Sequence, residues 1–286
     1  MRTIRGKIAL ITGAASGIGR ALALCLAREG ADLFLVDIDG EKLDRVANEI
    51  AEWNVRVVTH VCDLANREQI SGIATAVLKE FGAVDLLVNN AGVCYYGPTL
   101  RMTREQWDWL LGVNLEAPIS LTLDLLPTLL SRPEAHVVNV ASICGFVAGG
   151  RFAAYTVSKF GLVGFTEALR AEFGRQGLGV TCVCPGPVAT NFFASAASGR
   201  ENKPVPEPPK WACAKPELVA ERTLAGIYRD RRLVLVTPMA HLVHYANRLA
   251  PWLFDLMNRW GRRRNLKRKA SIADDDMRGE PARQAA

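Results

Sequence analysis

Apolar and polar positions alternate in a regular way from residue 7 to residue 238. Short apolar runs, rich in Val, Ile and Leu and almost continuous, are typical of strands buried on both faces. Amphipathic stretches of helical length separate these runs. The predicted strands are residues 7–12, 32–37, 55–61, 85–90, 136–142, 179–185 and 233–238. The predicted helices are residues 17–29, 41–52, 67–82, 104–130, 151–175 and 216–228.

This alternation of strand and helix predicts the fold class. Strands that are joined through helices form right-handed crossovers, which build a parallel sheet covered by helices on both faces. The chain has 286 residues and no internal repeat, which suits one large domain. We therefore predict one doubly wound α/β domain over residues 1–238 and an extension over 239–286. No apolar stretch reaches the length of about 18 residues that a membrane-spanning helix needs.

The first stretch that interrupts the alternation is residues 187–215. It is rich in Pro, Ala and Ser and carries Phe192, Phe193 and Trp211. A connection of this length in a compact domain is typical of a functional lid or of a disordered segment. We expect residues 190–212 to close over a substrate with one of these aromatic side chains as an apolar cover. The alternative is an ordered loop packed on a neighbouring subunit.

The second stretch is the extension, whose apolar residues recur at intervals of three and four. Pro251 should kink or divide this predicted helix. Such a face can dock on the domain, pair between subunits, or lie on a membrane through residues 239–269. We favour packing on protein, because the basic residues follow the helix instead of lining its polar face and Asp255 interrupts its apolar half. The apolar stripe is Leu242, Tyr245, Ala246, Leu249, Leu253, Leu256 and Trp260.

The positive charge is concentrated at the end of the chain. The net charge is +6, and residues 262–286 hold eight Lys or Arg against four Asp or Glu. The rest of the chain is close to neutral, whereas a nucleic-acid-binding protein is expected to carry a basic face on its fold. We therefore expect no nucleic-acid partner, and we expect a basic, disordered tail.

The cysteines and histidines indicate neither a disulfide framework nor a metal site. The seven cysteines are scattered and form no CxxC pair, which is typical of a reducing compartment, so we expect a cytoplasmic location. Cys182 and Cys184 lie two apart in a predicted strand and should face the same side. The four histidines form no ligand set, and we expect no metal.

A glycine-rich turn follows the first predicted strand and opens the first predicted helix. Glycines there let the backbone turn sharply and approach a pyrophosphate, which the helix N-terminus then binds. Asp37 ends the next strand, where a carboxylate accepts both adenosine ribose hydroxyls and repels a 2′-phosphate. Because Ser16 and Ile38 are not basic and Arg20 is taken as a helix residue, NAD is expected in preference to NADP. The turn residues predicted to bind are Gly13, Ser16, Gly17, Ile18 and Gly19.

A second group combines Ser142, Tyr155 and Lys159. Tyr155 and Lys159 are four residues apart, so they share one face of a helix. A free tyrosine has a pKa near 10, and an adjacent ammonium together with an oxidised nicotinamide would favour its phenolate. Ser142 lies at the end of a strand, where it can donate a hydrogen bond to a substrate oxygen.

Together these motifs resemble those of the short-chain dehydrogenase/reductase family. The matches fall in that family's order and spacing over about residues 5–238, with thirteen residues from Ser142 to Tyr155. The resemblance implies a Rossmann-type sheet of seven strands and NAD(P)-dependent oxidation or reduction at an alcohol or carbonyl. The matching segments are TGAASGIG (12–19), CDL (62–64), NNAG (89–92), VNLEAP (113–118), NVAS (139–142), YTVSK (155–159) and PGPVAT (185–190).

The resemblance also implies a role for each matching residue. Tyr155 would be the general acid or base, Ser142 would polarise the substrate oxygen, and Lys159 would lower the tyrosine pKa and hold the nicotinamide ribose. Asn114 would anchor a water that relays the proton. The remaining residues implied for cofactor binding are Asp63, Leu64, Asn90, Ala91, Gly92, Pro185, Gly186, Val188 and Thr190.

The resulting functional hypothesis is an oxidoreductase that interconverts an alcohol and a carbonyl on an apolar small-molecule substrate. The alternatives are a catalytically silent dinucleotide sensor and an interaction protein of the same fold. The chain is expected to form a homo-oligomer, either a dimer or a tetramer. Tyr95 and Tyr96 could line the pocket or pack in its wall, and Cys94 and Cys144 are expected to pack near the substrate.

Overall fold

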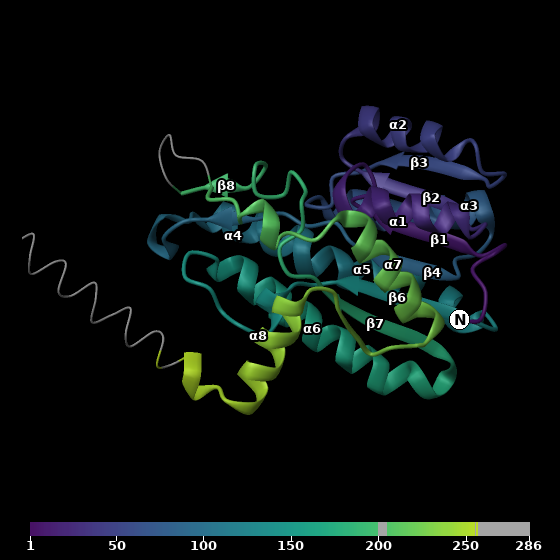
Figure 1. The fold of residues 1–286 in the computed structure, drawn as a ribbon. Helices are drawn as coiled ribbons and strands as arrows, with labels where there is room; N and C mark the ends of the chain where they lie inside the picture. The colour runs from purple at the N-terminus through teal and green to yellow at the C-terminus, as the bar shows by residue number, and fades with distance from the viewer. Residues whose placement is uncertain (200–204, 255, 257–286) are drawn as a thin grey trace, which may run out of the picture. The chain divides into compact units, whose positions relative to one another are not determined.

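The computed structural model describes residues 1–199, 205–254 and 256. The chain divides into two compact units, Met1–His241 and Leu242–Ala286. The first unit holds a seven-stranded sheet with helices on both of its faces (Figure 1). The predicted α/β class and the doubly wound, Rossmann-type sheet are therefore confirmed. Trp260 and the basic tail lie outside the described residues.

All strands of the large sheet run parallel, in the order β3-β2-β1-β4-β6-β7-β9. Because the strand order reverses between β1 and β4, the loops that follow these two strands diverge and leave a crevice at the carboxyl edge of the sheet. The strands are β1 (Ile8–Thr12), β2 (Asp32–Asp37), β3 (Val57–Val61), β4 (Leu86–Asn89), β6 (Ala135–Val140), β7 (Leu178–Cys184) and β9 (Leu233–Leu235).

Two layers of helices cover the sheet (Figure 1). Helices α1, α2 and α7 pack on one face, and α3, α5 and α6 pack on the other, each through its apolar side. Helix α4 continues into α5 and contacts α6. The helices are α1 (Gly17–Arg28), α2 (Gly40–Ile50), α3 (Arg67–Phe81), α4 (Arg104–Leu111), α5 (Ala117–Ser131), α6 (Ala153–Phe173), α7 (Pro216–Tyr228) and α8 (Pro238–Leu249).

The main departure from the predicted elements is in the helix expected over 104–130. The structure divides it into α4, a five-residue π-helical segment Gly112–Glu116, and α5. Within the described residues, Arg104–Ser131 is also long and apolar enough to cross a membrane by length and composition alone. Many of its residues are instead buried in the fold, where α5 packs on the sheet and on α3.

Smaller departures occur elsewhere. The last strand ends at Leu235 instead of residue 238, because Pro238 begins α8. Helix α8 itself ends at Leu249, two residues before Pro251. Two short strands that the sequence analysis did not predict, β5 (Tyr95–Tyr96) and β8 (Ala197–Ser198), pair in parallel outside the main sheet. They join the loop after β4 to the segment that was expected to be a lid.

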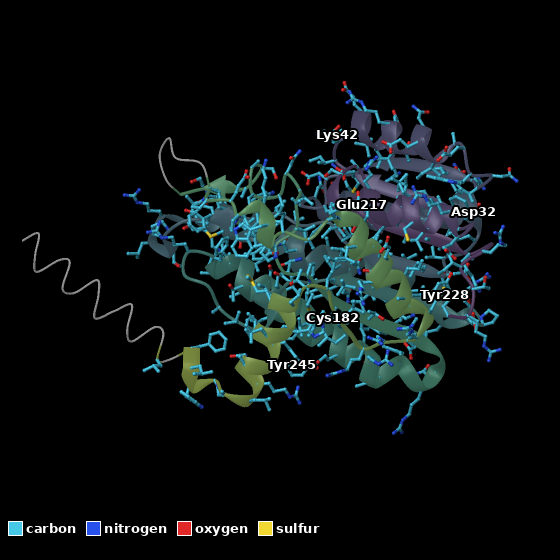
Figure 2. All side chains as sticks on the ribbon, viewed as in Figure 1. Asp32, Lys42, Cys182, Glu217, Tyr228 and Tyr245 are labelled. Carbon is cyan, nitrogen blue, oxygen red and sulfur yellow. The ribbon has the colours of Figure 1, made fainter. Side chains whose placement is uncertain are left out.

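Cys182 and Cys184 lie on the same side of β7, as predicted. Both side chains are buried, and their sulfur atoms are 3.6 Å apart (Cys182 is labelled in Figure 2). All seven cysteines are free thiols. Side-chain packing on the central sheet therefore accounts for this pair.

Buried polar side chains link the middle of the sheet to α5 and α6. The Asn89 amide donates to Asn139 Oδ1 (2.8 Å) and to Thr122 Oγ1 (3.1 Å). Asn139 in turn donates to Thr166 Oγ1 (2.9 Å). All four side chains are buried. Because an unpaired polar group in the core costs free energy, this chain of bonds fixes the two helices relative to β4 and β6.

His136, near the start of β6, is a buried histidine whose protonation state the structure defines. The Thr181 hydroxyl donates to the Arg231 carbonyl (2.7 Å), so it accepts its bond from His136 Nε2–H (2.8 Å). Nδ1 is buried and has no partner among the described residues. Burial lowers the pKa of His136 from 6.5 to about 3, because a second proton would leave a charge without a partner.

We expect His136→Gln to flatten the pH dependence of stability. The unfolded histidine takes up a proton below pH 6.5 and the folded one only near pH 3, so the folded state loses stability as the pH falls through this window. At pH 5 the loss is about 2 kcal/mol. Urea unfolding at pH 7.5 and pH 5 measures it. The control, His60→Gln on β3, keeps His136 and should keep the wild-type dependence; an unchanged dependence in His136→Gln would contradict the assignment.

Candidate active site

In the turn between β1 and α1, two glycines let the backbone approach other backbone atoms closely. Gly13 has a φ of +66°, and a Cβ on it would lie 2.8 Å from the Cα of Ala91. A Cβ on Gly19 would lie only 1.9 Å from the carbonyl oxygen of Gly13. Only glycine fits at these two positions. In the described part of the chain no side chain caps the first turn of α1, so its N–H groups can bind an anion.

The loop after β4 is tied directly to this turn. Thr12 Oγ1 accepts hydrogen bonds from the backbone N–H groups of Asn90 (3.0 Å) and Ala91 (3.1 Å). The Asn90 side chain donates in return to the carbonyl oxygens of Thr12 (2.9 Å) and Gly13 (3.1 Å). These four bonds hold the loops after β1 and β4 side by side at the point where the strand order reverses.

Asp37 lies at the carboxyl end of β2, beside the glycine turn. Its carboxylate accepts the N–H groups of Ala15 (2.9 Å) and Asp39 (3.1 Å), which fix its position. Arg20, which follows the glycine turn, is held by an ion pair with Glu49 on α2, and Lys42 is held by one with Asp39. The charge that borders this end of the cavity is therefore negative.

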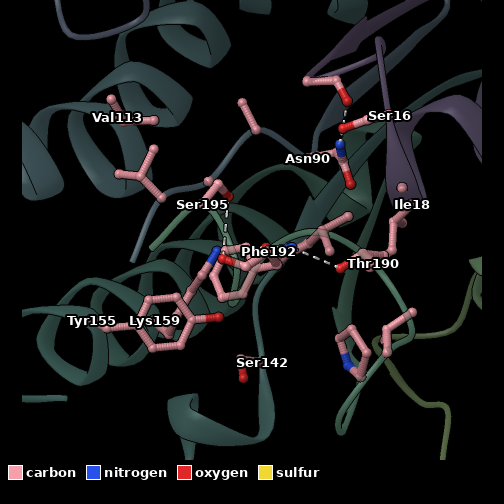
Figure 3. Close-up of a pocket in the computed structure, with 18 of the residues that line it drawn as sticks. Ser16, Ile18, Asn90, Val113, Ser142, Tyr155, Lys159, Thr190, Phe192 and Ser195 are labelled. Atoms are coloured by element: carbon pink, nitrogen blue, oxygen red, sulfur yellow. Dashed lines mark hydrogen bonds between the residues drawn. The ribbon is translucent and has the colours of Figure 1, made fainter. Parts of the chain in front are cut away.

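Tyr155 and Lys159 project from α6 and lie near Ser142, which follows β6. Figure 3 shows these three side chains at one end of the cavity, with Ser16, Ile18 and Asn90 at the other. The Lys159 ammonium donates to the Val140 carbonyl (2.9 Å) and lies 5.7 Å from the centre of the Tyr155 ring. Ser142 Oγ accepts the N–H of Cys144 (3.1 Å). A proton donor, a cation and a hydroxyl thus meet in one place.

Burial acts on both titratable groups of this trio in the direction that disfavours charge. It raises the pKa of the Tyr155 phenol, an effect that a hydrogen bond with Ser142 partly opposes. It also lowers the pKa of the Lys159 ammonium from 10.5 to about 8. Positive charge beside the phenol must therefore offset desolvation before a phenolate can form. Lys159 and an oxidised nicotinamide are the two groups that could supply it.

Asn114 is buried in the π-helical segment between α4 and α5. Its Oδ1 accepts the N–H of Val93 (2.8 Å), and its Nδ2 donates to the Val93 carbonyl (2.9 Å) and to Ser158 Oγ (3.2 Å). The π-helical turn inserts this side chain between the loop after β4 and helix α6, which carries Tyr155 and Lys159. Asn114 thus holds the two parts of the candidate site together, and it does not itself line the cavity.

Aromatic side chains form the wall at the Tyr155 end. The Phe192 ring lies 5.7 Å from the Tyr155 ring, and Phe152 lies 6.4 Å from it on another side. Phe193, the second of the three aromatic candidates for an apolar cover, also lines the cavity. Trp211, the third, is 86% exposed and does not line the cavity. The closure of this segment over a substrate stays a prediction.

The cavity has a volume of about 620 Å³ and runs from the glycine turn to the aromatic wall. Every residue predicted to bind the cofactor lines this cavity except Gly19, which instead lets the first turn of α1 pack against the Gly13 carbonyl. Tyr95 and Tyr96 do not line it. Side chains that the sequence analysis missed include Trp109 and Val113, one helical turn apart and just before Asn114. Their spacing of four residues, next to Asn114, could have indicated that both face the site. The continuous apolar pattern of the predicted helix concealed this, because it does not distinguish side chains that face the cavity from those in the core.

The cavity can hold a dinucleotide. The close approach at Gly13 and Gly19 leaves a backbone cradle for a pyrophosphate, and Asp37 stands where an adenosine ribose would lie. Asp63 and Leu64 line the same end, and Asp63 is held by accepting the N–H of Ala65 (2.9 Å). The ligand roles of these residues stay predictions.

Comparison with known proteins agrees with this geometry. Residues 7–201 match the family described as short chain dehydrogenase. The 3-oxoacyl-[acyl-carrier-protein] reductase FabG of Thermotoga maritima is 33% identical over 218 residues, which cover 76% of this chain and 89% of FabG.

Two solved structures are similar to the chain. A short-chain dehydrogenase/reductase from Burkholderia phymatum in complex with NAD has a TM-score of 0.79 and 28% identity, covering 88% of this chain and 96% of its own. A metagenomic short-chain oxidoreductase in complex with NADP has a TM-score of 0.70 and 33% identity, covering 82% of this chain and 98% of its own. Similar proteins thus bind either cofactor.

We expect Gly19→Ala to abolish dinucleotide binding. The added methyl group overlaps the Gly13 carbonyl, so the turn must open and the cradle is lost. The matched control is Gly72→Ala on α3, where a Cβ meets nothing within 4 Å. That variant should gain roughly 0.5–1 kcal/mol of stability and bind normally. Fluorescence titration with NADH and thermal unfolding measure both. Wild-type affinity in Gly19→Ala would contradict the role of this contact.

Proposed function

Because the chain belongs to the short-chain dehydrogenase family and is an NAD(P)-dependent oxidoreductase, we propose that it interconverts an alcohol and a carbonyl on an apolar substrate, with NAD as its preferred cofactor. The observation that carries the proposal is that the same cavity is lined by the glycine turn at Gly13 and by Ser142, Tyr155 and Lys159. NAD(P), when bound, accepts or supplies the hydride.

The protein's own residues handle the proton and the substrate oxygen. Tyr155 takes the hydroxyl proton when an alcohol is oxidised and returns it when a carbonyl is reduced. Ser142 donates to the same oxygen and orients it. Lys159 stabilises the charged form of Tyr155 against the effect of burial. Asn114 fixes the helix junction from which a proton could pass onward, through a water as the family resemblance implies.

An apolar substrate fits the wall that faces Tyr155. Trp109, Val113, Phe152 and Phe192 line this end, and they offer few polar groups to a sugar or another strongly hydrated substrate. A large apolar side of the substrate would displace water from these rings, which favours binding. Ser142 and Tyr155 supply the polar contacts that select the reacting oxygen.

The preference for NAD is supported by the charges around the adenosine end. The fixed Asp37 carboxylate would repel a 2′-phosphate and accept ribose hydroxyls. Arg20 is paired with Glu49, so its charge is already compensated. Ile38, at the position after Asp37, is 65% exposed and has no charge to offer.

We also propose that Phe192 belongs to a lid and that the chain forms a homo-oligomer in the cytoplasm. The lid is supported by the contact of Phe192 with Tyr155 and by the short β5–β8 pairing, which anchors residues 197–198 of the same segment. Self-association is supported by exposed apolar side chains on α5 and α6, among them Leu123, Val157 and Phe160. The seven free thiols suit a reducing compartment.

We expect Tyr155→Phe to lower turnover by about 10²–10⁴-fold while NADH binding stays within a factor of a few, because only the proton donor is lost. Rates over a panel of alcohols and ketones of graded size, followed by NADH absorbance, measure this. The matched control is Tyr95→Phe, which removes a nearby buried hydroxyl that has no partner among the described residues.

The control should keep turnover near the wild-type value. A Tyr155→Phe enzyme that retains a tenth of the wild-type rate would rule out the assignment. If the wild-type protein binds NADH but turns over no member of the panel, a dinucleotide sensor would be favoured instead.

We expect Asp37→Ser to shift the ratio of kcat/KM from NAD toward NADP by about tenfold or more, since the repulsion of a 2′-phosphate and two ribose hydrogen bonds are removed together. Asp44→Asn on α2 removes a carboxylate outside the cavity and serves as the control for net charge. A wild-type preference for NADP, or an unchanged ratio in Asp37→Ser, would contradict the role of this carboxylate.

A further inference from the structure

In the part of the chain that the structure describes, three buried asparagines each donate a hydrogen bond to a hydroxyl group on a helix. In every pair the hydroxyl donates in turn to a backbone carbonyl three or four residues earlier in its own helix, and both side chains are buried. Each pair therefore ties one helical turn to a neighbouring element. The pairs are Asn89 with Thr122 on α5 (3.1 Å), Asn139 with Thr166 on α6 (2.9 Å) and Asn114 with Ser158 on α6 (3.2 Å).

The pair on Ser158 differs from the other two in the carbonyl that it reaches. Ser158 Oγ donates to the carbonyl oxygen of Tyr155 (2.7 Å), the candidate acid or base (Figure 3). In an α-helix that carbonyl also accepts the N–H four residues later, which here belongs to Lys159. The other two hydroxyls reach carbonyls of residues that do not line the cavity, Pro118 and Leu162. Ser158 thus acts on the helical turn that joins Tyr155 to Lys159.

Asn114 gives Ser158 a fixed partner. Its Oδ1 accepts the N–H of Val93 (2.8 Å) and its Nδ2 also donates to the Val93 carbonyl (2.9 Å), so the amide group has one orientation. A Cβ on Gly92, which precedes Val93, would lie 3.5 Å from Asn114 Oδ1 and 3.6 Å from Lys159 Nζ. Both Gly92 and Val93 line the cavity. The chain of bonds through Ser158 therefore begins at the cavity wall and ends at the turn that carries the candidate acid or base.

Ser158 itself does not reach a substrate. Its side chain is fully buried and does not line the cavity. Any effect on a reaction must therefore pass through the positions of Tyr155 and Lys159. Burial disfavours the charged form of both side chains, and the ammonium, 5.7 Å from the centre of the Tyr155 ring, compensates a phenolate only at short range. A misplacement of about 1 Å in such a site can cost about 10²-fold in rate.

We propose that Ser158 is a positioning residue for the reaction, a role that rests on the oxidoreductase function proposed above. Its hydroxyl, held by Asn114, fixes the turn of α6 so that Tyr155 and Lys159 stand at the distance that proton transfer requires. The hydroxyl of Thr166, later on the same helix, makes the same kind of bonds and serves only to hold α6 on the sheet. Ser158 lies within the YTVSK segment, but nothing in the local pattern shows which carbonyl a buried hydroxyl reaches.

The first test compares Ser158→Ala with its matched control, Thr166→Val, on the best substrate of the alcohol and ketone panel. Ser158→Ala should lower kcat by about 10–100-fold. The KM of the substrate and the affinity for NADH should stay near the wild-type values, because no cavity residue changes. Thr166→Val removes a hydroxyl with the same two kinds of hydrogen bond and should keep kcat near the wild-type value. Both variants should lose a similar amount of thermal stability, since each loses one buried hydroxyl.

The second test observes the surroundings of Tyr155 without catalysis. The protein is labelled with 3-fluorotyrosine, so that ¹⁹F NMR reports on each of its five tyrosines, and the resonance of Tyr155 is assigned by its loss in Tyr155→Phe. In the presence of NAD, Ser158→Ala should shift or broaden this resonance, because the turn that carries the ring is released. Thr166→Val should leave it at the wild-type frequency.

The proposal is overturned if Ser158→Ala keeps the wild-type kcat, or if Thr166→Val lowers kcat as much, since the loss would then reflect the stability of the helix alone. It is also overturned if the Tyr155 resonance is the same in Ser158→Ala and in the wild type. The resonance needs no turnover. If the wild-type protein turns over no member of the panel, that result counts against the proposed reaction, while the resonance still decides whether Ser158 positions Tyr155.

Discussion

The hydrogen bonds between Thr12 and Asn90 are the interaction on which the rest of the site depends. A parallel sheet leaves the loops after β1 and β4 on opposite sides of its switch point, and nothing in the sheet ladder itself joins them. Thr12 Oγ1 and the Asn90 amide provide that connection through four bonds at 2.9–3.1 Å. The glycines at 13 and 19 are required by the same contact, because any side chain would separate the two loops.

A second feature of the structure is the amount of polarity buried close to the reacting groups. Lys159 is 3% exposed, and Asn114 and Ser158 are fully buried. Burying such groups is costly unless each has a partner, and here each has one at hydrogen-bond distance. The bond from Asn114 to Ser158 and the bond from Lys159 to Val140 each join two different elements. Buried polar groups that would lower stability without partners therefore hold α6 beside the cavity.

The two ends of the cavity differ in how they are built. The end at the glycine turn consists of short turns between buried strands and their helices, and its positions are defined by backbone contacts. The substrate end depends on side chains from α4, α6 and the loop after β7, which meet through packing such as that of Phe192 on Tyr155. Side chains on loops can change without disturbing the sheet, so this end can adapt to different substrates.

The sequence by itself determined the strands, most of the helices and the glycine turn after β1, because the elements follow from local periodicity and the turn follows from the spacing of its glycines. It also placed Ser142, Tyr155 and Lys159 correctly at a strand end and on one helix face. Tertiary structure alone decided the π-helical turn at Asn114, the β5–β8 pairing, the pairing of Arg20 with Glu49 and the outward turn of Trp211. These features join residues that are distant in the chain, and no local pattern records the packing between them.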